Sequence, residues 1–381
     1  MKKISLLSFS VAVFCLLSLS VWAEDIEPST SLRTYYASAN GKSGNDLRKA
    51  LQSIINGHTV VSYKQLGGLM QWSDTENADG KHVIDIYTDC AFTTSGPITW
   101  KSSGSVGDGM NREHTVPQSW FKEQSPMVSD AFHIYPTDCK ANNNRSSFLY
   151  GEVSGAGTSY SSKKCKETGK LGNSRLKKGD TYTCNGKTYT ITTTYDKRVY
   201  EPDDEYKGDL ARGYFYMATR YAGQCESWSG GAFGNAQNGL GAYTAELLLK
   251  WHRQDPVSEK ELIRNEAIYG NSHYNKSAYK QKNRNPFIDF PELVEYIWGD
   301  MQGVSVSIAD LETLYYETVD PDPEPDPDPE PEPEPEPEPD PDEAIDQTPY
   351  QPAQARKFIV NGKLYIVVDG HIYNTTGGRV Q

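Results

Sequence analysis

Three short blocks of sequence, all within residues 110–145, decide the fold of this chain: MNREHTVPQSWF (110–121), DAFHIYPTD (130–138) and NNNR (142–145). The FHIYP run of the second block is short and apolar, as in a buried strand, and the asparagines that follow can open a helix. Pro117 fixes its own φ and restrains the residue before it, which favours a bend after the first block. A strand, a second strand and a helix would then bring His114 and Asn142 together.

The polar residues of these blocks suit the hydrolysis of a phosphodiester. That reaction needs a base for water, a cation that neutralises developing charge, and positive groups that hold phosphates. His114 suits the base, because a neutral imidazole accepts a proton near pH 7. Glu113 and Asn142 offer the oxygen ligands that Mg²⁺ prefers, with Mn²⁺ or Ca²⁺ as alternative ions. Arg112 and Arg145 are expected to clamp phosphate oxygens.

The adjacency of Glu113 and His114 sets a condition on such a site. Neighbouring residues of a strand face opposite sides, so these two share a site only if the backbone bends or the metal and water lie at the strand edge. By itself, Arg-Glu-His is a weak signal that favours an exposed polar turn. The two blocks that follow favour the catalytic interpretation.

These blocks resemble the secreted endonuclease I family of bacteria, whose core is the ββα-metal, or His-Me finger, motif. The similarity continues through YEPDDEYKGDLAR (200–212) and NRNPFID (283–289), so it covers roughly residues 45 to 300. The resemblance implies a Mg²⁺-dependent nuclease with little sequence preference, acting on DNA and often on RNA through phosphate contacts. It also implies His114 as the general base and Glu113 and Asn142 as the metal ligands.

The predicted fold class is α+β: a ββα-metal nuclease core with additional helices, plus a small C-terminal β module. Four segments are expected in chain order: a signal peptide (1–23), the nuclease domain (24–318), an acidic Pro-rich linker (319–355) and the β module (356–381). The first has two lysines, an apolar run and a small-residue end, and is too short for a comfortable membrane span. We therefore expect a secreted, periplasmic or cell-surface protein with no integral membrane span.

The acidity of the chain belongs to the linker. Residues 320–346 hold 14 acidic and no basic side chains, which more than accounts for the formal net charge of −13. Alternating Pro and acidic residues form a stiff, extended spacer without a core. Beyond it, Asn-Gly and Asp-Gly between strand-like runs predict two hairpins. This module resembles short C-terminal modules of exported bacterial proteins, so a sorting or surface-attachment partner is expected, with an appendage that has no transport role as the alternative.

Further local patterns predict secondary structure and core residues. Helices are expected over residues 45–56, 212–221, 243–254 and 292–298, a strand over 85–89, and a Lys-rich surface hairpin within 160–195. His133 is expected to be a hydrogen-bonded core residue, and His252 a surface or capping residue. Of the five cysteines beyond the signal segment, Cys165 and Cys184 are the predicted disulfide pair.

The predicted function is thus extracytoplasmic cleavage of DNA and RNA by a monomer. The competing class is a non-catalytic secreted protein that binds nucleic acid or mediates adhesion, in which Glu113 and His114 are structural. A complete set of base and ligands in family order favours the enzyme.

Overall fold

The computed structural model describes residues 26–315 and, as backbone only, three C-terminal strands. The predicted signal peptide and nearly all of the predicted linker lie outside the described residues. The chain divides into two units. The first holds the described residues up to 315 except 182–189, and the second holds 182–189 together with the C-terminal strands.

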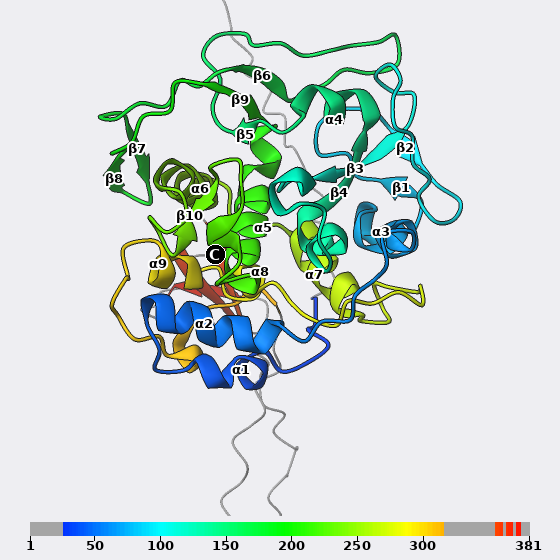
Figure 1. Cartoon of the computed structure of the whole chain (residues 1–381). Coiled ribbons are helices and arrows are strands. Elements are labelled where there is room, and N and C mark those ends of the chain that lie inside the picture. Colours follow the sequence, from blue (N-terminus) through cyan, green and yellow to red (C-terminus); the bar gives the residue numbers. More distant parts are fainter. Residues whose placement is uncertain (1–25, 316–354, 361–362, 369–370, 375–381) are drawn as a thin grey trace, which may run out of the picture. The chain divides into compact units, whose positions relative to one another are not determined.

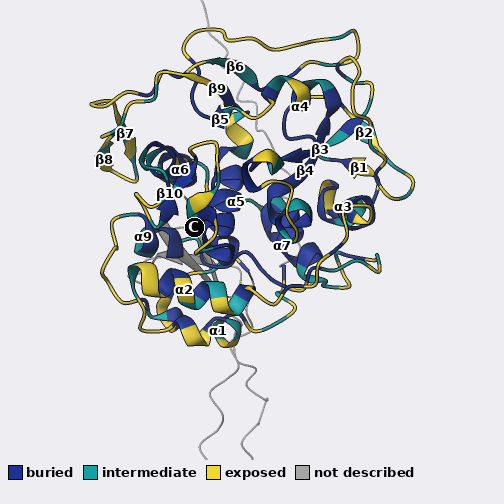
Figure 2. Cartoon of the chain, viewed as in Figure 1, coloured by how far each residue is buried: buried dark blue, intermediate teal, exposed yellow. Residues whose placement is uncertain are grey.

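Helix α5 (Lys207–Arg220) forms the centre of the first unit, and every one of its residues is buried. It packs against α2 (Gly44–Ile55), α6 (Ala242–Gln254) and α8 (Pro286–Asp289), as Figures 1 and 2 show. Apolar and aromatic residues surround α5, so its burial removes a large apolar area from water. The helices predicted over 45–56, 212–221 and 243–254 are confirmed, and α5 begins five residues before its predicted start.

The remaining helices are short or lie at the periphery of this centre: α1 (Leu32–Tyr35), α3 (Leu66–Ser73), α4 (Cys139–Arg145), α7 (Glu259–Tyr269) and α9 (Leu293–Ile297). Helix α7 begins at a capping box, in which Ser258 and Glu261 each satisfy a backbone N–H of the other. Helix α9 corresponds to the final helix predicted over 292–298. Within the described residues, no helix combines the length and the apolar run needed to cross a bilayer.

The strands of the first unit form several small sheets: β1 (His82–Val83) with β2 (Phe92–Thr93), β3 (Met110–His114) with β4 (Ile134–Asp138), β5 (Leu149–Tyr150) and β6 (Lys170–Asn173) on either side of β9 (Arg198–Glu201), and β10 (Phe233–Gly234) with β11 (Gly239–Leu240). Strands β7 (Thr181–Cys184) and β8 (Lys187–Thr190) form the hairpin predicted within 160–195. This mixture of helices and small sheets confirms the α+β class.

The C-terminal strands pair as the turn signals predict. Strand β12 (Ala355–Val360) is antiparallel to β13 (Lys363–Val368), which is antiparallel to β14 (His371–Asn374). The connecting residues 361–362 and 369–370 lie outside the described residues.

Two local predictions are wrong because long-range contacts decide these segments. Residues 85–89 do not form a strand; the Asp85 carboxylate is buried and accepts a hydrogen bond from Thr88 Oγ1 at 2.6 Å and another from Thr137 Oγ1. His252 is buried rather than on the surface, because the last turn of α6 packs over Arg212 of α5, whose Nη1 lies 3.4 Å from the imidazole Nδ1.

The predicted disulfide is also wrong. Cys165 is bonded to Cys90, 75 residues earlier, and not to Cys184. A β-bridge between Thr88 and Glu167 places the two backbone segments side by side, with the cysteine Cα atoms 5.1 Å apart. That separation suits a disulfide, and spacing along the chain could not have revealed it.

Candidate active site

The three sequence blocks within residues 110–145 contain β3, β4 and the end of α4, in that order. Strands β3 and β4 are antiparallel, with Arg112 opposite Pro136 and His114 opposite Ile134 (Figure 1). Pro136 has no backbone N–H that could donate to Arg112. The sheet loses no hydrogen bond at this pair, because the Arg112 carbonyl accepts from Asn142 Nδ2 instead. The strand, strand and helix order is therefore as predicted.

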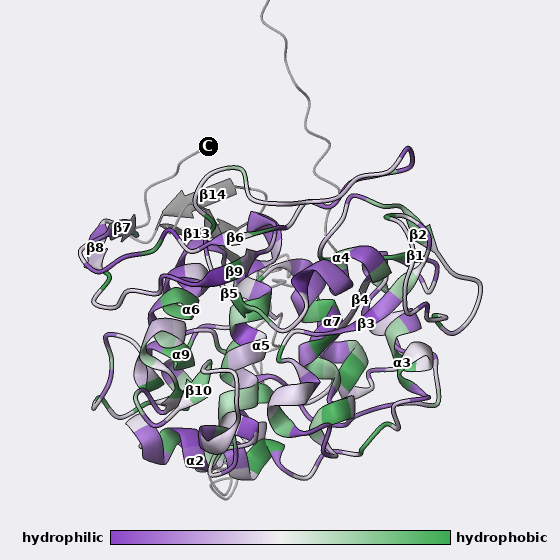
Figure 3. Ribbon diagram, turned by 45° about the horizontal axis from the view of Figure 1, so that its top comes forward, coloured by the Kyte–Doolittle hydropathy of each residue, from purple (hydrophilic) through white to green (hydrophobic). Residues whose placement is uncertain are grey.

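The start of α4 is fixed by a carboxylate. Asp138, the last residue of β4, accepts hydrogen bonds from Lys140 N and Ala141 N through Oδ1, at 2.8 and 3.1 Å. Its own N–H donates to the buried Asp85 carboxylate at 3.0 Å. Asp138 therefore caps α4 with its side chain and is itself held by Asp85 through its backbone N–H, which fixes how the helix begins after β4. Helix α4 is mainly hydrophilic (Figure 3), and this cap fixes the position of its polar side chains relative to β4.

Two side chains of α4 bind the backbone of β3. Asn142 Nδ2 donates to the Arg112 carbonyl at 3.2 Å, and Arg145 Nη1 donates to the His114 carbonyl at 3.0 Å. Residues three apart on a helix share a face, and alternate carbonyls of a strand share an edge. Helix α4 therefore lies along the edge of β3 that is not paired with β4. Glu113 and His114 face opposite sides of β3, and the two sides meet at this edge. A site shared by both residues would therefore lie at this edge.

The imidazole of His114 is buried, 6% exposed, and its Nε2 lies 3.2 Å from the Val128 carbonyl. A carbonyl only accepts, so Nε2 carries the hydrogen and Nδ1 keeps its lone pair. Within the described residues, Nδ1 has no hydrogen-bond partner. Burial, with the nearby His133, lowers the pKa of His114 to about 3. The ring is therefore a neutral acceptor of protons around pH 7.

His133 has the role expected from the sequence. Its side chain is completely buried, and its Nε2 donates to the Met127 carbonyl at 2.7 Å. Its ring contacts that of His114 with centroids 5.5 Å apart. His133 therefore packs beneath the candidate base.

Glu113 faces the interior and is 1% exposed. Its Oε1 accepts a hydrogen bond from Tyr87 Oη at 2.9 Å and lies 3.2 Å from Arg145 Nη1. Burial raises the pKa of Glu113, against the opposing effects of Arg145 and Tyr87. Within the described part of the chain, nothing donates to Oε2. Tyr87 was not singled out from the sequence, because it lies in the segment that resembled a strand.

The two arginines have different surroundings. Arg145 is buried, and its guanidinium pairs with Glu113 and donates to the carbonyls of His114 and Thr115. This arrangement favours a role in positioning β3. The half-buried Arg112 instead lies between the rings of Tyr63 and Trp100. The phosphate clamp expected of both arginines stays a prediction, and the geometry favours Arg112 for it.

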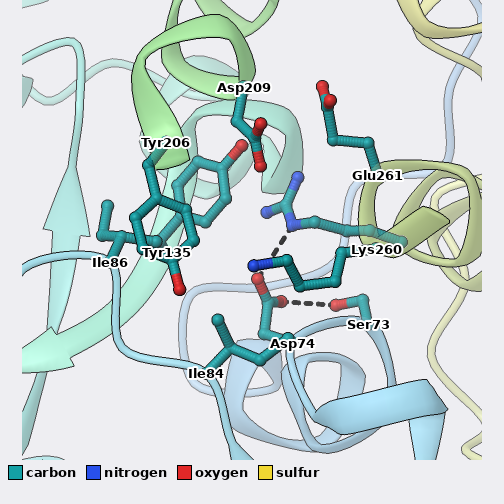
Figure 4. Close-up of a pocket in the computed structure, with 10 residues that line it drawn as sticks. Ser73, Asp74, Ile84, Ile86, Tyr135, Tyr206, Asp209, Lys260 and Glu261 are labelled. Atoms are coloured by element: carbon teal, nitrogen blue, oxygen red, sulfur yellow. Dashed lines mark hydrogen bonds and ion pairs between the residues drawn. The ribbon is translucent and has the colours of Figure 1, made fainter. Parts of the chain in front are cut away.

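A separate pocket holds a dense charge cluster (Figure 4). Arg264 pairs with Asp74 at 2.8 Å, and Ser73 donates to the same carboxylate at 2.6 Å. Arg264 also donates to the carbonyls of Ala131 and Ile134, at 2.7 and 2.9 Å. Arg264 thus holds the backbone that enters β4, and its pairing with Asp74 is a structural bond.

The predicted ligands Glu113 and Asn142 carry oxygen donors of the type that a hard metal ion takes. No group of three or more His, Cys, Asp or Glu residues suited to a metal ion occurs among the described residues. One carboxylate and one carboxamide remain: Glu113 Oε2 and Asn142 Oδ1, neither of which has a partner among the described residues. Mg²⁺ commonly keeps several waters and takes few protein oxygens. The donor set therefore suits it.

Strands β3 and β4 with helix α4 place the chain in the class of α+β proteins built around a strand-strand-helix unit. Within that class, residues 43–292 match the model of the endonuclease I family, and the chain belongs to this family of nucleases. It is 36% identical over 283 residues to an extracellular ribonuclease of Bacillus amyloliquefaciens, covering 72% of this chain and 81% of the relative. An extracellular ribonuclease of Bacillus subtilis strain 168 is 32% identical over 285 residues, covering 74% and 84%.

Proposed function

We propose that this nuclease is secreted, uses Mg²⁺, and hydrolyses the phosphodiester bonds of both DNA and RNA with little sequence preference. The observation that carries the proposal is the tautomer of His114, whose Nδ1 has no hydrogen-bond partner among the described residues, with Glu113 beside it on β3 and Asn142 on the adjoining α4. Bound there by Glu113 and Asn142, Mg²⁺ would neutralise charge that develops on the phosphate and the leaving oxygen.

The protein's own residues supply the proton transfer. A water molecule attacks phosphorus and gives its proton to Nδ1 of His114, while the P–O bond to the leaving sugar oxygen breaks and that oxygen takes a proton from solvent. The Val128 carbonyl stabilises the imidazolium through Nε2. An anionic phosphate beside the ring favours the charged imidazole, which offsets the lowering of its pKa by burial.

The attacking group in this mechanism is water, so the 2′-hydroxyl of RNA takes no part. DNA should therefore be a substrate alongside RNA, and RNA products should lack a 2′,3′-cyclic phosphate. The relatives are named ribonucleases, which supports RNA as one of the substrates.

The test is incubation of the purified protein with plasmid DNA and with RNA, in Mg²⁺ and then in excess chelator, followed by analysis of the product ends. Cleavage of both polymers that stops with chelator and returns with Mg²⁺ is expected. Cleavage of RNA alone, with cyclic phosphate ends, would overturn the proposed nucleophile. Full activity in excess chelator would overturn the proposed requirement for Mg²⁺.

Secretion and the tail form a second part of the proposal. The word extracellular in the relatives' names and the predicted signal peptide support export. The C-terminal module is proposed to bind a sorting or surface-attachment partner. Truncation after Thr318 should then leave cleavage nearly unchanged and move the enzyme between the cell surface and the medium. An unchanged distribution in fractionated cultures would contradict this role.

A further inference from the structure

The guanidinium of Arg112 is held between two aromatic rings. Its Cζ lies 4.2 Å from the ring centroid of Tyr63 and 4.4 Å from that of Trp100. Tyr63 precedes α3, and Trp100 follows β2, so three separate segments meet at this side chain. We call Tyr63 and Trp100 the aromatic clamp.

The clamp is unusual because it contains no carboxylate. Within the described residues, Arg112 makes no ion pair, and its Nε is buried without a hydrogen-bond partner. Most of the buried arginines are paired with acids, namely Arg48 with Glu226, Arg145 with Glu113, Arg212 with Glu261, and Arg264 with Asp74, whereas the buried Arg220 donates through Nε to His58 Nδ1 at 3.1 Å. A ring attracts and orients a guanidinium without cancelling its charge or occupying its in-plane N–H donors.

The clamp adjoins the candidate base. Arg112 and His114 are two residues apart on β3 and therefore lie on the same face of the strand. The ring of Tyr63 also stacks on that of His114, with centroids 5.9 Å apart and planes at 24°. Tyr63 is 36% exposed and Trp100 is partly exposed, so a ligand can approach the group from solvent.

We propose that Tyr63 and Trp100 are positioning residues, which hold the uncompensated guanidinium of Arg112 ready to bind a substrate phosphate next to the scissile one. The proposal rests on the proposed function, because it assigns a substrate contact to the same site. A carboxylate partner would orient Arg112 equally well, but would compete with the phosphate for its donors. The aromatic clamp avoids that competition.

The test combines binding and turnover on a short oligonucleotide. The Tyr63→Leu and Trp100→Leu variants keep apolar bulk and lose the ring, and each should raise KM by about fivefold, in line with a cation–π contribution of about 1 kcal/mol. For Trp100→Leu, kcat should change less than about twofold, since a neighbouring phosphate is held equally in the ground and transition states. Tyr63→Leu also removes the stack on His114, so it is judged by KM and affinity. The Tyr63→Phe variant keeps the ring and should restore the parental KM.

A double-mutant cycle separates this role from direct stacking on a nucleobase. If Tyr63 acts through Arg112, then Tyr63→Leu should have almost no further effect in an Arg112→Ala background. An equal loss in both backgrounds would overturn the proposal and favour base stacking. The control is Tyr160→Leu, which removes a ring that lies 3.9 Å from Lys140 Nζ in a separate cation–π pair and should leave KM unchanged.

Dissociation constants measured in the His114→Ala background make the outcome independent of cleavage. A weaker affinity after Tyr63→Leu, rescued by Phe, supports the clamp even if the parent cuts neither polymer. An unchanged affinity, in a parent that does cut, overturns the clamp and leaves the proposed function intact.

Discussion

The two faces of β3 use arginine in opposite ways. On the inner face, Arg145 is buried against Glu113 and two backbone carbonyls. On the outer face, Arg112 is half-buried between aromatic rings and has no acidic partner among the described residues. A buried charge must be paired, whereas a partly solvated one can remain uncompensated. The inner arginine therefore stabilises the strand, and the outer one remains available for an anionic ligand.

The same contrast applies to the two side chains that neighbour each other in sequence. Glu113 shares Oε1 between Tyr87 and Arg145, while His114 keeps Nδ1 free of protein partners in the described part of the chain. The inner face thus holds the strand in place, and the outer face carries Nδ1, the atom proposed to accept the proton. Helix α4 joins the two because its Asn142 and Arg145 both bind the edge between them.

The largest effect should come from the outer face. Replacing His114 with Ala should lower the cleavage rate by a factor on the order of 10² to 10⁴, because it removes the general base. The protein should remain folded, with a lower denaturation midpoint because a buried ring and its hydrogen bond to Val128 are lost. The exposed His82, which pairs with Asp79, provides the matched control, and His82→Ala should cleave at the parental rate. A well-folded His114→Ala protein with an unchanged rate would contradict the division between the faces.

The inner face should instead determine stability. Arg145→Met should lower the free energy of unfolding by roughly 3–5 kcal/mol, because Glu113 is left buried without its partner. Arg112→Met should cost less than about 1 kcal/mol, since no charge loses a partner. Urea unfolding of both variants measures the difference. Adding Glu113→Gln to Arg145→Met should recover part of the loss, and equal losses for the two arginines would refute the comparison.

The edge between the faces should determine metal binding. Glu113→Ala and Asn142→Ala should each weaken Mg²⁺ binding by about tenfold or more, because each would remove one of two protein ligands. Calorimetric titration measures this directly. Asn143, one residue further and exposed, is the control, and Asn143→Ala should bind Mg²⁺ normally. A ligand variant that binds as the parent does would remove that residue from the site.

A pH-dependent effect concerns a carboxyl that holds α4. Glu167 accepts hydrogen bonds from Asn144 Nδ2 and Tyr200 Oη, and burial raises its pKa from 4.5 to about 7. A pKa raised by folding gives stability that is complete below pH 4.5 and is lost as the pH rises through 7. The free energy of unfolding of the parent should fall by roughly 1–3 kcal/mol over that range relative to Glu167→Gln.

Unfolding curves of the parent and the variant at pH 4.5, 6 and 8 test this slope. Parallel curves for the parent and Glu167→Gln would show that Glu167 titrates alike in the folded and unfolded chain.

Local sequence determined much of this protein. Helices α2, α5 and α6 follow from apolar and aromatic residues at helical spacing, and the three C-terminal strands follow from alternation and turn residues. The β3, β4 and α4 order follows from a short apolar run and an Asn-rich turn. The residues proposed for catalysis and metal binding come from the same blocks, because their chemistry can be recognised at short spacing.

Only the tertiary structure decided which of these groups are buried and which atoms they contact. The Cys90–Cys165 bond, the burial of His252 and the pairing of Arg145 with Glu113 all depend on neighbours from other elements. The aromatic clamp joins Tyr63 and Trp100 to a strand that neither belongs to. Periodicity and turn chemistry report on residues within a few positions of each other. Partners that meet only when helices and sheets pack leave no such local pattern.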